Sequence, residues 1–159
     1  MSKKQMDIHI EHIPELKNRK CQVASSVFED SVLNKIVALR KKYSNKKAKF
    51  WAVPAGQHWV KGSEQAKEWC KENNLDFVEL INMPYVKALE TLAQAEGLCF
   101  LPSGADTCPR LVIEAKLLGC KLNLNEHVQH VKEGWFNTNN LEEIEQYLRG
   151  VSNRFWNSC

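Results

Sequence analysis

The chain has 159 residues and a formal net charge of +3, and 43% of its residues are apolar. This length is typical of one domain, and the apolar content is enough for a hydrophobic core, which excludes a chain that is disordered throughout. The basic residues gather mainly in two runs, at residues 17–20 and 40–49, without an aromatic stacking platform in a pattern typical of RNA binding. We therefore expect no nucleic-acid partner.

The six cysteines show no metal-binding pattern. None forms a Cys-x-x-Cys pair, and none has a histidine nearby at the spacing of zinc ligands. The N-terminal stretch MSKKQMDIHIEHIPEL lacks the apolar core of a signal peptide, and no apolar stretch is long enough to cross a bilayer. We expect reduced thiols, no bound metal, no transmembrane segment and a cytoplasmic location. The absence of a transmembrane segment does not exclude peripheral contact with a membrane.

Apolar runs of strand length alternate with segments of helical period along the chain. In the helical segments apolar residues recur every three or four positions, whereas short continuous apolar runs indicate buried strands. In the first half, the expected elements are a strand and loop at 22–28, a helix through 32–43, a strand at 49–55, a helix capped by Ser63 that ends near 73–74, and a strand at 75–81.

The second half continues the same alternation. The expected elements are a helix that Pro84 opens and Gly97 closes, a strand at 98–101, a helix at 109–119 between Pro109 and Gly119, a strand at 120–125, and a closing helix at 141–148. This order predicts a single α/β domain, a three-layer Rossmann-like fold with a parallel sheet and helices on both faces. No linker divides the chain, so we expect an α/β core over 29–150, preceded by residues 1–28 and followed by a tail at 151–159.

Two loops follow predicted strands, at the place where open parallel sheets bind ligands. In the first, PAGQHWVKGS (54–63), Lys61 would place an ammonium group on a phosphate. Gly56 and Gly62 would let the backbone of this loop approach a ligand closely. A lone lysine before a helix is common, so this loop alone is a weak signal.

The second loop, PSGADT (102–107), leads into the next predicted helix. The unpaired amides and partial positive charge of a helix N-terminus suit an anionic phosphate. Asp106 or Thr107 has the alternative role of capping that helix. Glu114 lies inside the apolar segment LVIEAKLL, where a carboxylate is costly unless it is paired or faces a cleft. We expect the helix start to hold phosphate and the two acids to accept hydrogen bonds from sugar hydroxyls.

The stretch LPSGADTCPRLVIEAKLLGCKL resembles the donor-site signature of retaining glycosyltransferases of the GT-B fold (glycosyltransferase group 1, family 4-like). In that signature a Pro-Ser strand end leads to E-x7-E, an alanine, and a glycine before the next strand. Trp59-Val60-Lys61-Gly62 is similar to the Lys-Gly loop of the family, and LINMPYVKALETLAQAEGLCFLPS is similar to its Pro-Tyr turn and following helix. The resemblance covers roughly residues 49–125, and the matching positions of the signature are Pro102-Ser103, Asp106, Pro109, Glu114-Ala115 and Gly119.

This resemblance implies one half of a GT-B fold, which binds a nucleoside-diphosphate sugar with UDP or GDP as the nucleotide. Glu114 would hydrogen-bond the ribose, Asp106 would face the donor sugar, and Lys61 would neutralise the leaving diphosphate, so Asp106 and Lys61 are the expected catalytic residues. The amides of Thr107 and Cys108 would meet phosphate or sugar. No metal or cofactor is implied beyond the sugar nucleotide. The expected substrate-binding residues are Glu114, Gly104, Thr107, Cys108, Arg110 and Tyr85.

The sequence departs from the family pattern in three ways. The first acid is Asp106, which is one methylene shorter than the usual glutamate. An arginine that normally precedes the lysine is absent near Gly56, and Arg110 is a candidate to supply its charge. Members of the family also have an N-terminal acceptor domain, for which this chain has no room. Residues 1–28 are similar to their interdomain segment, so we expect a truncated chain, a partner chain that carries the acceptor domain, or a homo-oligomer.

Two other hypotheses stay open. The chain is alternatively a non-catalytic nucleotide-sugar-binding or interaction module that keeps the fold without turnover, or a flavodoxin-like redox domain that uses Cys108, because a thiol at a helix N-terminus can have a lowered pKa. His127 and His130, three residues apart near the end of the last predicted strand, are candidate ligand-binding residues, although packing histidines are more common.

Overall fold

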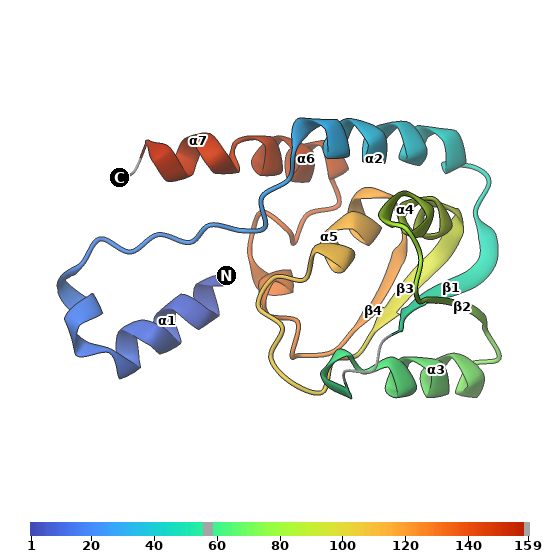
Figure 1. Ribbon diagram of the computed structural model, residues 1–159, viewed down its shortest axis with the longest axis horizontal. Coiled ribbons are helices and arrows are strands. Elements are labelled where there is room, and N and C mark those ends of the chain that lie inside the picture. Colours follow the sequence, from blue (N-terminus) through green and yellow to red (C-terminus); the bar gives the residue numbers. More distant parts are fainter. Residues whose placement is uncertain (56–58, 158–159) are drawn as a thin grey trace.

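The computed structural model describes the whole chain except residues 56–58 and 158–159, and it leaves the side chain of Trp59 undescribed. Figure 1 shows the arrangement of the elements. In chain order they are α1 (Lys3–His12), η1 (Pro14–Asn18), α2 (Asp30–Tyr43), β1 (Ala48–Pro54), η2 (Trp59–Lys61), α3 (Ser63–Glu72), β2 (Asp76–Leu80), α4 (Tyr85–Gln94), β3 (Ala95–Phe100), α5 (Arg110–Leu117), β4 (Lys121–Leu124), η3 (Gln129–Lys132), α6 (Leu141–Arg149) and α7 (Val151–Trp156).

Within the described residues, four strands form one parallel sheet in the order β2-β1-β3-β4. The chain runs from β1 to β2 on one side and then crosses to β3 on the other side of β1. The strand order therefore reverses between β1 and β3, and ligands bind at such a point in open α/β sheets.

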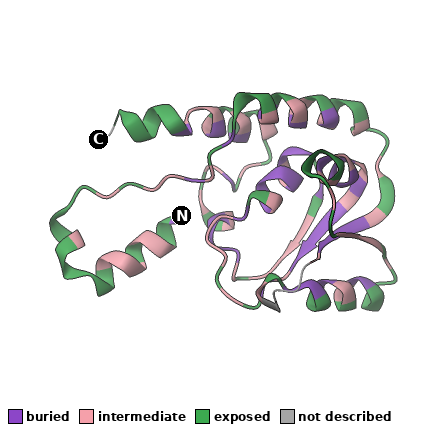
Figure 2. Ribbon diagram, viewed as in Figure 1, coloured by how far each residue is buried: buried purple, intermediate pink, exposed green. Residues whose placement is uncertain are grey.

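Helices cover both faces of the sheet (Figure 1). α3 packs on one face over a small core of five buried residues, while α4 and α5 pack on the other face, with α2 and α6 outside them. Figure 2 shows the buried residues gathered in the strands and on the helix faces turned toward them. This confirms the expected three-layer α/β fold. The small core under α3 consists of Trp51, Val53, Ala66, Cys70 and Cys99.

The start of α3 depends on Gly62 rather than on the predicted cap Ser63. Gly62 is the N-cap residue and has a φ of 67°, whereas Ser63 is the first helical residue and caps nothing. A Cβ on Gly62 would lie 1.7 Å from the carbonyl oxygen of Leu101, at the end of β3. Gly62 therefore packs closely against the backbone of the loop that follows β3, and its expected close approach to a ligand stays a prediction.

The boundary between α4 and β3 also differs from the prediction. α4 ends at Gln94, and the chain enters β3 at Ala95 without a turn, so Gly97 lies inside the strand and closes no helix. A Cβ on Gly97 would come within 2.6 Å of the indole ring of Trp51. The glycine therefore makes room for an aromatic side chain on the neighbouring strand.

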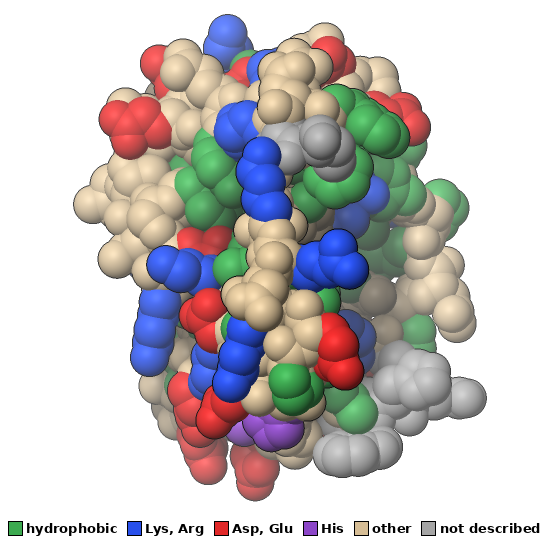
Figure 3. Space-filling model, turned by 90° about the vertical axis from the view of Figure 1, so that its left-hand side faces the viewer, with side chains coloured by type: hydrophobic (Ala, Val, Ile, Leu, Met, Phe, Trp, Pro, Cys, Tyr) green, Lys and Arg blue, Asp and Glu red, His purple; other side chains and the backbone are tan. Residues whose placement is uncertain are grey.

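The terminal segments lie together at one end of the molecule. Residues 22–28, compatible with a strand and loop in the sequence, form no strand, and residues 151–156, expected in the tail, form α7. Figure 3 shows this end, where Lys and Arg side chains are interspersed with acidic and hydrophobic ones among the described residues. Among the described residues, no helix has the length and apolar character needed to span a membrane.

Candidate functional site

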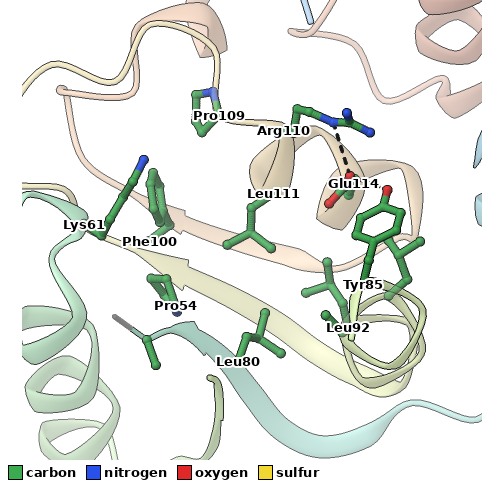
Figure 4. A pocket seen from close by; sticks show the side chains of 13 residues that line it. Pro54, Lys61, Leu80, Tyr85, Leu92, Phe100, Pro109, Arg110, Leu111 and Glu114 are labelled. Atoms are coloured by element: carbon green, nitrogen blue, oxygen red, sulfur yellow. Dashed lines mark hydrogen bonds and ion pairs between the residues drawn. The ribbon is translucent and has the colours of Figure 1, made fainter. Parts of the chain in front are cut away.

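A pocket of about 360 Å³ lies at the carboxyl ends of three neighbouring strands. Pro54, Leu80 and Phe100, which are the last residues of β1, β2 and β3, line it together with residues of α4 and α5 (Figure 4). This is the point at which the strand order reverses, so the pocket has the position expected of a ligand site in this fold.

Lys61 borders the pocket from the loop after β1 and meets Asp106 from the loop after β3. The Nζ atom of Lys61 donates a hydrogen bond to Oδ2 of Asp106 at 2.8 Å. The two loops are also tied by their backbones, because the N–H of Ser103 donates to the carbonyl of Val60 at 3.0 Å. The structure therefore brings together two of the residues that the sequence singled out, although they are 45 positions apart.

Asp106 is held in place by its backbone as well. Its N–H donates to the carbonyl of His127, and its own carbonyl accepts from the N–H of Gln129. The interpretation of Asp106 as the cap of the following helix is wrong, because α5 begins after Pro109 without a side-chain cap. The carboxylate of Asp106 is instead paired with Lys61 beside the pocket.

Glu114 lies in the second turn of α5 and is buried, with only 5% of its surface exposed. The hydroxyl of Tyr85, at the start of α4, donates to its Oε1 atom at 2.7 Å, and Nε of Arg110 lies 3.7 Å from the same atom. Burial raises the pKa of Glu114, whereas the hydrogen bond from Tyr85 and the charge of Arg110 act in the opposite direction. Burial, and then the Glu114 carboxylate, raise the pKa of the Tyr85 phenol.

The polar groups lie at two ends of an apolar floor (Figure 4). Lys61 stands at one end, and Arg110, Glu114 and Tyr85 stand at the other. Such a pocket suits a ligand that has an anionic part near the lysine and hydroxyl groups near the carboxylate.

Three expected substrate-binding residues lie in the loop beside the pocket without lining it. Thr107 and Cys108 precede α5, and within the described residues their amides donate to no backbone carbonyl. The carbonyl of Cys108 accepts a hydrogen bond from Ser26 at 2.9 Å. Gly104 has room for a side chain, because an added Cβ would meet only Val60, at 3.9 Å. Gly56 lies outside the described residues.

The two candidate histidines do not line the pocket. His127 contributes its backbone carbonyl to Asp106, and His130 is buried between the rings of Trp135 and Phe136. Neither ring nitrogen of His130 has a hydrogen-bond partner among the described residues. Across all the residues that the structure describes, no cluster of three or more His, Cys, Asp or Glu residues is placed to hold a metal ion.

The apolar floor was missed at the sequence level. Its central residues are Leu80, Leu92 and Phe100, and two of these end a strand. Because parallel strands end at the same edge of a sheet, the apolar residues near the end of each predicted strand were the available signal, although the predicted strands run one residue past Leu80 and Phe100.

No family model, curated protein or solved structure matches this chain.

Proposed function

We propose that this chain is the donor-binding domain of a glycosyltransferase and holds a nucleoside-diphosphate sugar in the pocket between α4 and α5. The observation that carries this proposal is one pocket at the reversal of strand order, with Lys61, paired to Asp106, at one end and Glu114 at the other. Each of these residues was selected from the sequence for a phosphate- or hydroxyl-binding role.

The diphosphate would lie beside Lys61 and the first turn of α5. The Lys61 side chain is 51% exposed, so an anion can reach its ammonium group, and its bond to Asp106 balances the charge while no ligand is bound. A diphosphate would compete for this ammonium group and leave the Asp106 carboxylate to accept a hydrogen bond from the donor sugar. A fixed cation at this place stabilises the charge that develops on the leaving diphosphate.

The ribose would lie against Glu114. Its buried carboxylate accepts the Tyr85 hydrogen bond through Oε1, and further lone pairs are available for ribose hydroxyls. Tyr85 and Arg110 hold the carboxylate from the side of α4 and from the preceding turn of α5. The carboxylate is therefore oriented before the ligand arrives, which lowers the entropic cost of binding.

Titration calorimetry with UDP, GDP and ADP tests this proposal. We expect at least one of them to bind, and we expect Lys61→Ala and Glu114→Gln each to weaken that binding by about 10- to 100-fold, as for the loss of a hydrogen bond to a charged group. The matched control is Lys71→Ala, because Lys71 is exposed in the last turn of α3 and lines no part of the pocket.

Two outcomes would contradict the proposal. One is that well-folded protein binds none of the nucleotides. The other is that Lys61→Ala and Glu114→Gln bind as tightly as the Lys71→Ala control. A circular-dichroism spectrum and a thermal unfolding curve for each variant separate lost binding from lost folding.

A further inference from the structure

A second hollow, of about 440 Å³, adjoins the proposed nucleotide pocket. It is lined by Val27, Glu29, Val32, Tyr85 and Arg110. Tyr85 and Arg110 also line the nucleotide pocket, so the two spaces share these side chains as a common wall.

Across the two hollows, the charged and polar groups follow the order of a nucleotide. Lys61 stands at the far end of the first pocket and Glu114 at the common wall, and Glu29 stands beyond that wall. A nucleoside diphosphate bound with its phosphates at Lys61 and its ribose at Glu114 would direct its base into the second hollow. This inference rests on the proposed function, because it uses the same phosphate and ribose positions.

The walls of the second hollow suit a flat heterocycle. Val27 and Val32 are apolar, and Tyr85 offers an aromatic ring. The guanidinium group of Arg110 lies over the ring of Phe28, 4.5 Å from its centroid, which orients it. Aromatic rings and arginine guanidinium planes are surfaces on which nucleobases stack.

Glu29 supplies the acceptor that distinguishes one base from the others. It is the only acid among the described residues that line the second hollow, and it is exposed. It occupies the N-cap position of α2, yet its side chain makes no capping hydrogen bond, and among the described residues it accepts only from the Ser31 hydroxyl, at 3.3 Å, through Oε2. Lone pairs of its carboxylate are therefore available to a ligand.

Guanine is the base that matches this acceptor. Its N1–H and N2–H donors lie side by side, so they can meet both oxygens of one carboxylate, whereas uracil offers one N–H between two carbonyls and adenine offers an amino group next to an acceptor nitrogen. We propose that Glu29 reads guanine and that the nucleotide of this chain is GDP.

Titration calorimetry with GDP, IDP, UDP and ADP tests this proposal, because IDP differs from GDP only in lacking the 2-amino group. We expect the unmodified protein to bind GDP about 10- to 100-fold more tightly than IDP, UDP or ADP, as for a bidentate base contact. In Glu29→Ala the preference of GDP over IDP should fall to within about twofold, and UDP affinity should stay unchanged. Glu68→Gln, an exposed acid on α3, is the matched control and should keep the full preference.

The possible failures are distinguishable. If UDP or ADP binds as tightly as GDP, or if GDP and IDP bind alike, the guanine inference is overturned while the proposed function stands. If Glu29→Ala keeps the preference for GDP, the role of Glu29 is overturned. If no nucleoside diphosphate binds to folded protein, the proposed function fails and this inference fails with it.

Discussion

Glu114 is a carboxylate in an apolar setting, kept there by two neighbours. Burial alone favours its protonated form, while the hydroxyl of Tyr85 and the guanidinium of Arg110 favour its charged form. A ribose-binding carboxylate is most useful when ionised, because it then has the most lone pairs for hydroxyl donors. The two neighbours therefore oppose the effect of burial at the position where the proposed ligand needs an acceptor.

Tyr85→Phe removes the hydrogen bond to Glu114 and should raise the pKa of Glu114 further. The variant should lose roughly 1–3 kcal/mol of unfolding free energy at neutral pH, because it leaves a buried charged acceptor poorly satisfied. The loss should shrink as the pH falls toward the ordinary glutamate pKa of 4.5, because the protonated carboxyl needs this donor less. Urea denaturation at several pH values measures both effects.

Tyr43→Phe is the control for this experiment. Tyr43 ends α2 and lines no part of the pocket, and its hydroxyl has no hydrogen-bond partner among the described residues, so its loss should change stability equally at every pH. If the loss in Tyr85→Phe were also independent of pH, the hydrogen bond would have no effect on the ionisation of Glu114.

At the residue scale, the sequence identifies which side chains belong to the site better than it identifies their hydrogen-bond and ion-pair partners. Glu114 was recognisable because a charge in an apolar helical segment must be paired or face a cleft. Its donor Tyr85 was expected to bind substrate and not to donate to Glu114, and the bond between Lys61 and Asp106 was not predicted. Both contacts join segments far apart in the chain, and they depend on how the strands are ordered in the sheet.

At the element scale, periodicity predicted the main helices and strands. Errors arose where a single glycine or capping residue was used to predict the end of an element. Gly97 was expected to end a helix, but sheet pairing and the ring of Trp51 place it inside β3. Helix α1 was not expected, because none of its residues is buried and its sequence carries no apolar stripe. Local patterns identify elements with a buried face, and they do not reveal which neighbour a glycine accommodates.

Three glycine substitutions separate backbone conformation from close packing. Gly62→Ala should lower the unfolding free energy by at least about 2 kcal/mol, because a Cβ there combines a positive φ with a clash against Leu101. Gly119→Ala should cost about 1 kcal/mol, because its φ is positive but nothing lies within 4 Å of the added atom. Gly134→Ala should lie within about 0.5 kcal/mol of the unmodified protein.

Chemical denaturation of the three variants checks this order. The Gly62 substitution is the informative one, because Gly62 is the N-cap of α3 and Lys61 precedes it directly. Equal losses in Gly62→Ala and Gly119→Ala would show that the contact with Leu101 relaxes without cost.

At the scale of the whole molecule, a column of stacked side chains joins the C-terminal helices to the site. Tyr147 of α6 stacks on Trp135 with ring centroids 4.7 Å apart, and Trp135 stacks on His130 of η3 at 5.7 Å. Arg154 of α7 covers the Tyr147 ring at 4.1 Å. Because the N–H of Gln129, the neighbour of His130, donates to the carbonyl of Asp106, this column is connected to the loop in which Asp106 pairs with Lys61 beside the pocket.

His130 makes the stability of this stacked column depend on pH. Burial lowers its pKa from 6.5 to about 4, with the charge of Asp106 opposing the shift, so the folded protein keeps the ring neutral where the unfolded chain already binds a proton. The contribution of His130 to stability is complete above about pH 6.5 and is lost progressively as the pH falls toward 4. Between about pH 7.5 and 5, this loss amounts to about 2 kcal/mol.

His130→Phe keeps an aromatic ring in the column and removes the titrating group. We expect the unfolding free energy of the unmodified protein to fall by about 2 kcal/mol more than that of the variant between these two pH values, whatever their difference at neutral pH. Guanidinium denaturation at both pH values measures the two slopes, with His12→Phe, an exposed position at the end of α1, as the control that should follow the unmodified protein. A parallel fall in all three proteins would place the acid sensitivity elsewhere, because only a group that is buried neutral and becomes charged on unfolding produces the difference that we expect.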